Sequence, residues 1–227
     1  MRPLVLILAV LALLLAACGE DDDPPEPSEK QAAKAQNESA DGDPGGCQEL
    51  AAPEPKPDGG AKKPTEPLAA GRTYESVMKT SCGDFTIRLD QKISPKTAAS
   101  FASLARSGFY DDTVFHRIVP GFVIQGGDPT GTGTGGPGYK TVDKPPANAS
   151  YTRGVVSMAK TGTEAPGTAG SQFYVVTGAD AGLPPDYAIV GEVTEGMDAV
   201  MRIEALGTPT EQPSRPVVIE KATASDS

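Results

Sequence analysis

Short alternating runs of apolar and polar residues dominate the chain from residue 74 onward. Residues 74–80 and 85–90 alternate on either side of Cys82-Gly83-Asp84, which is the pattern of a β-hairpin. Six further apolar runs, separated by clusters of glycine and proline, cover residues 114–119, 122–125, 155–159, 172–176, 188–193 and 216–223. These runs predict eight short β-strands. We expect an antiparallel barrel, because closure of a sheet removes its exposed edges.

Two segments have helical spacing instead. The first begins at Ser94 and Pro95, a hydroxyl residue suited to capping followed by a proline suited to the first helical position, and it ends at Gly108. The second covers residues 197–205, where apolar side chains recur every three to four positions. The predicted fold is therefore mainly β, a closed eight-stranded antiparallel barrel capped by two helices.

Composition changes sharply near residue 70. Residues 19–70 hold 13 acidic residues, five lysines and nine prolines, and no aromatic residue precedes Tyr74. Such a segment buries too little apolar surface to offset the entropy of ordering it. From residue 71 the charges are nearly balanced, and about 155 residues suffice for one core. The charge pattern contains no basic stripe, which argues against a nucleic acid partner.

The amino terminus has the features of an export signal. Arg2 precedes a continuous apolar run over residues 3–17, which is too short to span a membrane comfortably and fits a signal peptide. The sequence Leu15-Ala16-Ala17-Cys18 resembles the bacterial lipobox, in which the signal is cut before the cysteine and the thiol receives a diacylglyceryl group. An ordinary signal with an unrelated cysteine is the alternative.

We therefore divide the chain into three parts. They are a lipoprotein signal peptide (1–17), a lipidated, acidic, proline-rich and disordered tether (18–70), and a folded domain (71–227). Fatty acyl groups such as palmitate on Cys18 would anchor the protein to the cell membrane, on the extracytoplasmic face. The acidic segment is then a solvated tether rather than an acidic binding motif.

The other two cysteines follow from this location. Cys47 lies in the tether and Cys82 in the predicted hairpin turn. Outside the cytoplasm two unlipidated cysteines are more often oxidised than free. We predict a disulfide between Cys47 and Cys82, with two free thiols as the alternative.

The sequence implies no metal and no organic cofactor. The glycine-rich stretch 131–136 lacks the Gly-Lys-Ser/Thr that completes a phosphate-binding loop, so a plain loop is expected there. His116 is the only histidine, and one histidine without a neighbouring nucleophile or cysteine cluster makes neither a catalytic triad nor a zinc site.

One long stretch resembles a known family. Residues 115–128, Phe-His-Arg-Ile-Val-Pro-Gly-Phe-Val-Ile-Gln-Gly-Gly-Asp, resemble the signature of the cyclophilin-type peptidyl-prolyl cis/trans isomerases. Three more stretches agree with that family in order and spacing: residues 133–136, residues 156–159 leading to 170–174, and residues 183–193. The resemblance covers residues 73–223, almost all of the predicted domain.

The resemblance implies an isomerase that acts on X–Pro bonds of exported proteins as a monomer. By position, it makes Arg117, Phe122 and Gln125 the catalytic residues. The residues that it assigns to substrate binding are Val123, Gly133, Ala159, Lys160, Gln172, Tyr174, Leu183 and Tyr187. Several of these depart from the family's usual residues, since Val123 replaces methionine, Lys160 asparagine and Tyr174 phenylalanine.

The chemistry of these residue types suits the reaction. Twisting an X–Pro amide breaks its resonance, so the transition state needs an apolar pocket for the ring and a fixed donor at the prolyl amide rather than covalent chemistry. Arg117, permanently charged and rigidly forked, is such a donor. The alternative is a module that binds proline-containing segments, as a scaffold or adhesin, with little turnover.

Overall fold

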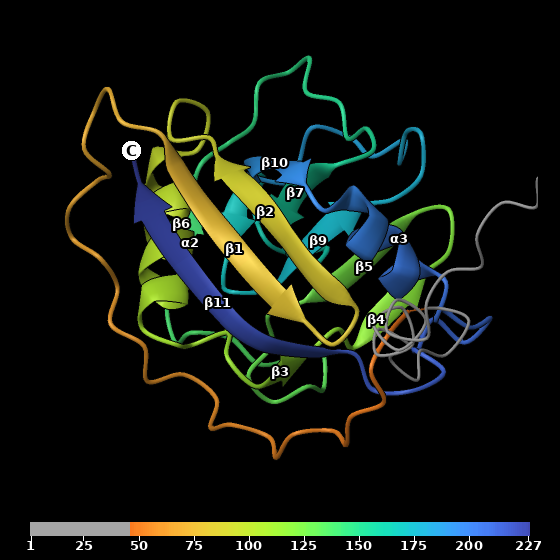
Figure 1. Ribbon diagram of the computed structural model, residues 1–227. Coiled ribbons are helices and arrows are strands. Elements are labelled where there is room, and N and C mark those ends of the chain that lie inside the picture. The colour runs from red at the N-terminus through yellow and green to blue at the C-terminus, as the bar shows by residue number, and fades with distance from the viewer. Residues whose placement is uncertain (1–45) are drawn as a thin grey trace, which may run out of the picture. The chain divides into compact units, whose positions relative to one another are not determined.

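The computed structural model describes residues 46–227, which form a mainly β domain with two helices (Figure 1). Nine strands make one antiparallel sheet in the order β3-β11-β1-β2-β10-β7-β9-β5-β4, and β6 pairs with β8 separately. The strands are β1 (Tyr74–Thr80), β2 (Gly83–Leu89), β3 (Thr113–Val114), β4 (Arg117–Val119), β5 (Val123–Gly126), β6 (Thr141–Val142), β7 (Val155–Met158), β8 (Thr168–Ala169), β9 (Phe173–Val176), β10 (Ile189–Glu195) and β11 (Val218–Asp226). The helices are α2 (Pro95–Arg106) and α3 (Met197–Glu204).

The prediction of a closed eight-stranded barrel is wrong. The main sheet is a strongly curled, open half-barrel, and its edge strands β3 and β4 do not pair with each other. They are successive pieces of one stretch that the sequence predicted as a single strand, separated only by Phe115 and His116. β3 pairs with β11 and β4 with β5, so the two edges meet through the chain itself instead of through a ladder of hydrogen bonds.

Both predicted helices are present, but the cap of α2 differs from the prediction. Pro95 opens the helix as expected, whereas the Ser94 hydroxyl makes no capping hydrogen bond. The Asp143 carboxylate accepts instead from the Thr97 amide at 2.7 Å. A residue more than 40 positions away therefore supplies the cap, which local sequence spacing does not reveal.

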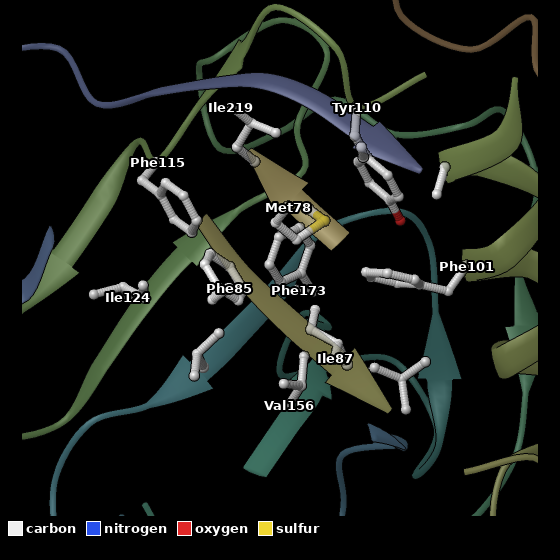
Figure 2. Close-up of a cluster of buried hydrophobic side chains, with 14 of the residues drawn as sticks. Met78, Phe85, Ile87, Phe101, Tyr110, Phe115, Ile124, Val156, Phe173 and Ile219 are labelled. Carbon is white, nitrogen blue, oxygen red and sulfur yellow. The ribbon is translucent and has the colours of Figure 1, made fainter. Parts of the chain in front are cut away.

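Aromatic side chains fill the inside of the curled sheet (Figure 2). Phe173 of β9 lies at their centre, with ring centroids 5.4 Å from Phe101, 5.7 Å from Tyr110 and 6.0 Å from Phe115. Each of these pairs has a near-perpendicular geometry, which aromatic rings favour. The rings come from β9, from α2, from the loop between α2 and β3 and from the link between β3 and β4, so this cluster joins the helix to the sheet.

Residues 46–70 are not a free tether. Figure 1 shows this segment, in orange, running round the outside of the domain before it enters β1. Backbone amides of Lys56, Gly59 and Ala61 donate to Pro129, Gly136 and Pro137, at 2.8, 2.9 and 3.1 Å. We call residues 46–70 the strap. The expectation of disorder as far as residue 70 does not hold for it, because hydrogen bonds to the domain and the packing of Cys47, Ala61 and Leu68 in or against the core hold it in place. Residues 1–45, with Cys18 and the rest of the predicted tether, lie outside the described residues.

The disulfide between Cys47 and Cys82 is present, as predicted. It attaches the beginning of the strap to the turn between β1 and β2, and both residues belong to the hydrophobic core. The Gln48 amide donates to the Ser81 carbonyl at 2.6 Å beside it. Within residues 46–227, none of the helices is long and apolar enough to cross a membrane.

Removal of this disulfide should destabilise the domain. The cross-link closes a loop with a sequence separation of 35, and the entropy that it removes from the unfolded chain corresponds to about 3–4 kcal/mol. We expect the Cys47→Ala/Cys82→Ala variant to lose about this much in the free energy of unfolding, measured by denaturant titration. Reduction of the wild-type protein is the control and should have a similar effect, and an unchanged midpoint in both cases would contradict the prediction.

Candidate active site

The candidate site lies on the outer face of the curled sheet, where one row of residues crosses four strands. Arg117 of β4 pairs with Gln125 of β5, which pairs with Tyr174 of β9, which pairs with Ser157 of β7. Because side chains alternate along a strand, directly opposed residues share a face. The register therefore gathers three of the predicted site residues, which come from two distant parts of the sequence.

Beside this row lies a pocket of about 170 Å³, lined mostly by apolar and aromatic residues but with polar side chains at its sides. Arg117 and Gln125 lie on one side of it, and Lys160 on another. Its full lining is Arg117, Phe122, Val123, Gln125, Ala159, Lys160, Tyr174, Leu183 and Tyr187. We call it the proline pocket, after the role that the resemblance predicted for its lining residues. Every residue predicted for catalysis or substrate binding lines it, apart from Gly133 and Gln172.

Those two residues line a second pocket of about 240 Å³, which is more polar. It shares Gln125, Ala159 and Lys160 with the proline pocket, so the two cavities adjoin. Its other side is the glycine loop, residues 129–137, together with Lys140 and Glu164. The Lys140 ammonium and the Glu164 carboxylate form an ion pair at 2.9 Å.

A continuous chain of hydrogen bonds runs across both pockets. The Arg117 Nη1 group donates to Gln125 Oε1 at 3.4 Å, and Gln125 Nε2 donates to Gln172 Oε1 at 3.0 Å. Gln172 Nε2 in turn donates to the carbonyls of Gly133 and Gly135, at 3.0 and 2.9 Å. The Arg117 side chain is thereby linked to the backbone of the glycine loop, and the orientation of each group depends on the next.

Two carboxylates, those of Asp128 and Asp58, bind backbone amides of the glycine loop. The Asp128 carboxylate accepts from the amides of Thr130, Gly133 and Gly135, and Gly135 lies so close to it that a side chain there would clash. Burial alone would raise the pKa of Asp128, but these hydrogen bonds hold it below its ordinary value. On the outside of the loop, Asp58 of the strap accepts from the Gly136 amide at 2.8 Å. The loop is therefore fixed between the site and the strap.

Tyr174 and Tyr187 form one wall of the proline pocket, the tyrosine wall, and a third tyrosine, Tyr151, packs against Tyr187. Tyr187 packs edge-to-face against both Tyr174 and Tyr151, with centroids 5.8 and 6.1 Å apart. The Tyr151 hydroxyl donates to the Tyr187 carbonyl and accepts from the Tyr187 amide, so it fixes the backbone of that wall. The Tyr174 hydroxyl is buried, and burial raises the pKa of Tyr174 well above its ordinary value. Tyr174 therefore presents a neutral ring to the pocket.

Lys160 lies where the two pockets meet, and its side chain is only 5% exposed. Its ammonium group donates to the Glu164 carbonyl at 3.2 Å and lies 5.3 Å from the centre of the Tyr187 ring. Asp186 is 3.8 Å away. The paired ammonium group of Lys160 therefore lies at the boundary between the proline pocket and the second pocket.

His116 precedes Arg117 in the sequence but lines neither pocket. Both of its ring nitrogens are buried and have no hydrogen-bond partner among the described residues. Burial is the main reason why its pKa is lowered, the nearby Asp128 carboxylate opposes that effect, and the Arg117 guanidinium adds to it. The imidazole is therefore neutral at pH 7.

Sequence reasoning missed four residues that shape the site: Tyr151, Asp128, Asp58 and Glu211. Glu211 forms an ion pair with Arg117, with 2.7 Å between Oε2 and Nε. Tyr151 and Glu211 lie outside the stretches that resemble the family, and Asp58 lies in a segment whose composition indicates disorder. Only Asp128 had a signal, as the last residue of the long signature. Within residues 46–227, no three His, Cys, Asp or Glu side chains are grouped so that they could hold a metal ion.

The fold and this arrangement are those of a known class of enzymes. Residues 76–224 match the family described as "Cyclophilin type peptidyl-prolyl cis-trans isomerase/CLD". The chain therefore belongs to the cyclophilin family, and it is a cyclophilin-type peptidyl-prolyl cis/trans isomerase.

Individual relatives agree with this assignment. Peptidyl-prolyl cis-trans isomerase CYP18-2 of Arabidopsis thaliana is 38% identical over 161 residues, which cover 69% of this chain and 96% of the plant protein. Peptidyl-prolyl cis-trans isomerase A of Mycobacterium tuberculosis is 40% identical over 178 residues, which cover 70% of this chain and 94% of that protein.

Solved structures show the same likeness. A cyclophilin type isomerase of Cryptosporidium parvum has a TM-score of 0.62 and 32% identity, and the match covers 67% of this chain and 98% of that one. A second structure of the same isomerase, determined in the presence of the dipeptide Ala-Pro, has a TM-score of 0.61.

The lowered pKa of His116 predicts a loss of stability in mild acid. The unfolded chain takes up a proton at this residue more readily than the folded one. The free energy of unfolding should therefore fall as the pH drops below about 6.5, by at most about 1.4 kcal/mol per pH unit. Asp128 stays charged through this range, since its pKa is lowered too.

Denaturant titrations between pH 7.5 and pH 5 would measure this slope. The His116→Gln variant is the control, because it removes the only histidine of the chain. Its slope over the same range should be clearly smaller than that of the wild type. Identical slopes would mean that His116 does not titrate differently in the two states.

Proposed function

We propose that Arg117 accelerates X–Pro rotation by stabilising the twisted amide through hydrogen bonds, without covalent chemistry. The observation that carries the proposal is the position of its guanidinium at the side of the proline pocket, held by Gln125 and Glu211. Glu211 takes the Nε hydrogen and Gln125 one Nη1 hydrogen. The remaining Nη hydrogens are left for a bound peptide.

The energy required is within the reach of such a site. The rotation barrier of a peptide bond is about 18–20 kcal/mol, and an acceleration of four to five decades requires roughly 5.5–7 kcal/mol of transition-state stabilisation. An amide that has lost its resonance has a nitrogen that accepts a hydrogen bond better and a less polar carbonyl. A fixed cationic donor therefore binds the twisted state more strongly than either planar isomer, and this difference is what catalysis requires.

The pockets divide the substrate between them. The proline ring enters the pocket formed by Phe122, Val123 and the tyrosine wall, where its burial from water favours binding. Residues before the proline lie over the second pocket, along Ala159, Gln172 and the glycine loop. The positive charge of Lys160, at the boundary of the two pockets, disfavours substrates with a positively charged side chain at that point.

We further propose that the protein acts on exported proteins as a monomer anchored by lipid on Cys18, on the extracytoplasmic face of the cell membrane. The lipobox-like sequence before Cys18 and the apolar run ahead of it support this location. The Cys47–Cys82 disulfide supports it independently, because such bonds persist mainly in oxidising compartments. Residues 19–45 are then the part of the acidic segment left to connect the lipid to the strap.

The Arg117→Ala variant tests the catalytic role. Loss of one electrostatic donor to the transition state should lower kcat/KM by about 30- to 1000-fold, which corresponds to about 2–4 kcal/mol. A protease-coupled assay on an Ala-Pro peptide measures the rate. The circular dichroism spectrum should stay unchanged, because the Arg117 side chain is one-third exposed. Activity within about two-fold of the wild type would refute the proposed mechanism.

The Cys18→Ala variant tests the anchor. The wild-type protein, expressed in a bacterium with lipoprotein processing, should incorporate labelled palmitate and partition into detergent, whereas the variant should do neither. The Cys47→Ala variant is the matched control, since it removes a cysteine that we do not expect to be lipidated. Labelling of the Cys18→Ala variant, or none of the wild type, would exclude the lipid anchor.

A further inference from the structure

Glu211 is the acidic side chain that pairs with the proposed catalytic arginine. Its Oε2 accepts from Arg117 Nε at 2.7 Å, and its carbonyl accepts from the Ile118 amide at 2.8 Å. Glu211 therefore contacts both the side chain of Arg117 and the backbone of the next residue in β4. This double contact fixes the loop after α3 against the edge strand that carries Arg117.

The loop around Glu211 is itself tightly closed. The Glu211 amide donates to the Thr208 carbonyl at 2.9 Å, and the Thr208 amide donates to the Gln212 carbonyl at 3.2 Å. A β-bridge joins Gly207 to Pro213 at its base. The carboxylate is thus presented from a fixed backbone rather than from a loose surface segment.

The backbone at Glu211 has an unfavourable conformation. Its φ is +64°, and among the described residues only Asp112 shares a positive φ without being glycine. Glycine, asparagine and aspartate tolerate this region, whereas a long side chain such as glutamate gains nothing from it. A strained residue in contact with a catalytic group indicates that its side chain has a role there.

Stability does not account for this ion pair. The side chains of Arg117 and Glu211 are 34% and 51% exposed, and ion pairs as exposed as this one contribute little to the stability of a fold. The ion pair instead fixes the orientation of the Arg117 guanidinium. With Nε bound to Glu211 and Nη1 bound to Gln125, the plane of the guanidinium is fixed at two points, and its remaining N–H groups keep one direction.

We propose that Glu211 is a positioning residue for Arg117, holding the guanidinium plane so that its free N–H groups face the proline pocket. This inference rests on the role proposed above for Arg117. Glu211 acts through Arg117 and does not contact the substrate. Its loss should lower kcat more than it changes KM, because a misplaced donor costs most in the transition state.

Three substitutions of Glu211 separate orientation from folding. Glu211→Ala removes the carboxylate, and Glu211→Gly removes both the carboxylate and the backbone strain. Each should lower kcat by about five- to twenty-fold with KM changed less than about two-fold. The Glu211→Gly variant should melt at the same temperature as the wild type or higher, so its loss of activity cannot come from unfolding. Glu211→Gln keeps an acceptor oxygen and should recover part of the activity.

Exchange spectroscopy by NMR at several peptide concentrations gives kcat and KM, and the Nε–H signal of Arg117 reports the contact directly. That signal should move or broaden in Glu211→Ala. The matched control is Glu192→Ala, which breaks the similarly exposed pair of Arg88 and Glu192 and should leave both readouts unchanged. The double variant Arg117→Ala/Glu211→Ala should be no slower than Arg117→Ala alone.

The outcomes distinguish the two proposals. If Arg117→Ala itself retains activity, the mechanism proposed for Arg117 fails, and this inference with it. If Arg117→Ala is slow while Glu211→Ala and Glu211→Gly both stay within about two-fold of the wild type, the role of Arg117 stands and the role of Glu211 is overturned. An equal loss of activity in the Arg117→Ala background would also overturn it.

Discussion

The strand register of β4, β5, β9 and β7 places both the core and the candidate site. Ile118, Ile124, Val175 and Val156 form one row across these strands, and each is completely buried. The next row along is Arg117, Gln125, Tyr174 and Ser157, on the opposite face. A shift of one residue in any pairing would exchange core and site. Burial of the inner row therefore aligns the outer row, and the site needs no separate scaffold.

The hydrogen bonds around the candidate site fix the orientation of its side chains. In the proposed mechanism no covalent step is required, so the rate would depend on how closely the Arg117 donor is aimed at the amide as it twists. The hydrogen bonds from Glu211 through Arg117, Gln125 and Gln172 to the glycine loop give each group a fixed neighbour. Asp128 holds the loop from within and Asp58 from the strap, so the amino-terminal segment contributes to the shape of the second pocket.

Predictions from local pattern succeeded where the physical cause was local. The hairpin of β1 and β2, the proline that opens α2 and the presence of α3 all agree with the structure. These predictions failed where the local structure depends on a residue distant in the sequence. Asp143 replaces the expected cap at Ser94, and the strand predicted over residues 114–119 divides at Phe115 and His116. Hydrogen bonds from amides of the strap to distant backbone carbonyls help to order it. An acidic, proline-rich composition does not reveal these hydrogen bonds.

The amino-acid sequence was sufficient to predict a mainly β fold, the family, the residues around the proline pocket and a partner for Cys47. Alternation, turn residues and one long signature suffice for these, since each is written in neighbouring positions or in a motif of known spacing. Three features are visible only in the folded structure: the sheet stays open, residues 46–70 lie on the domain, and Glu211 forms an ion pair with Arg117. These depend on pairings across the chain, where the free energy comes from groups that no local pattern brings together.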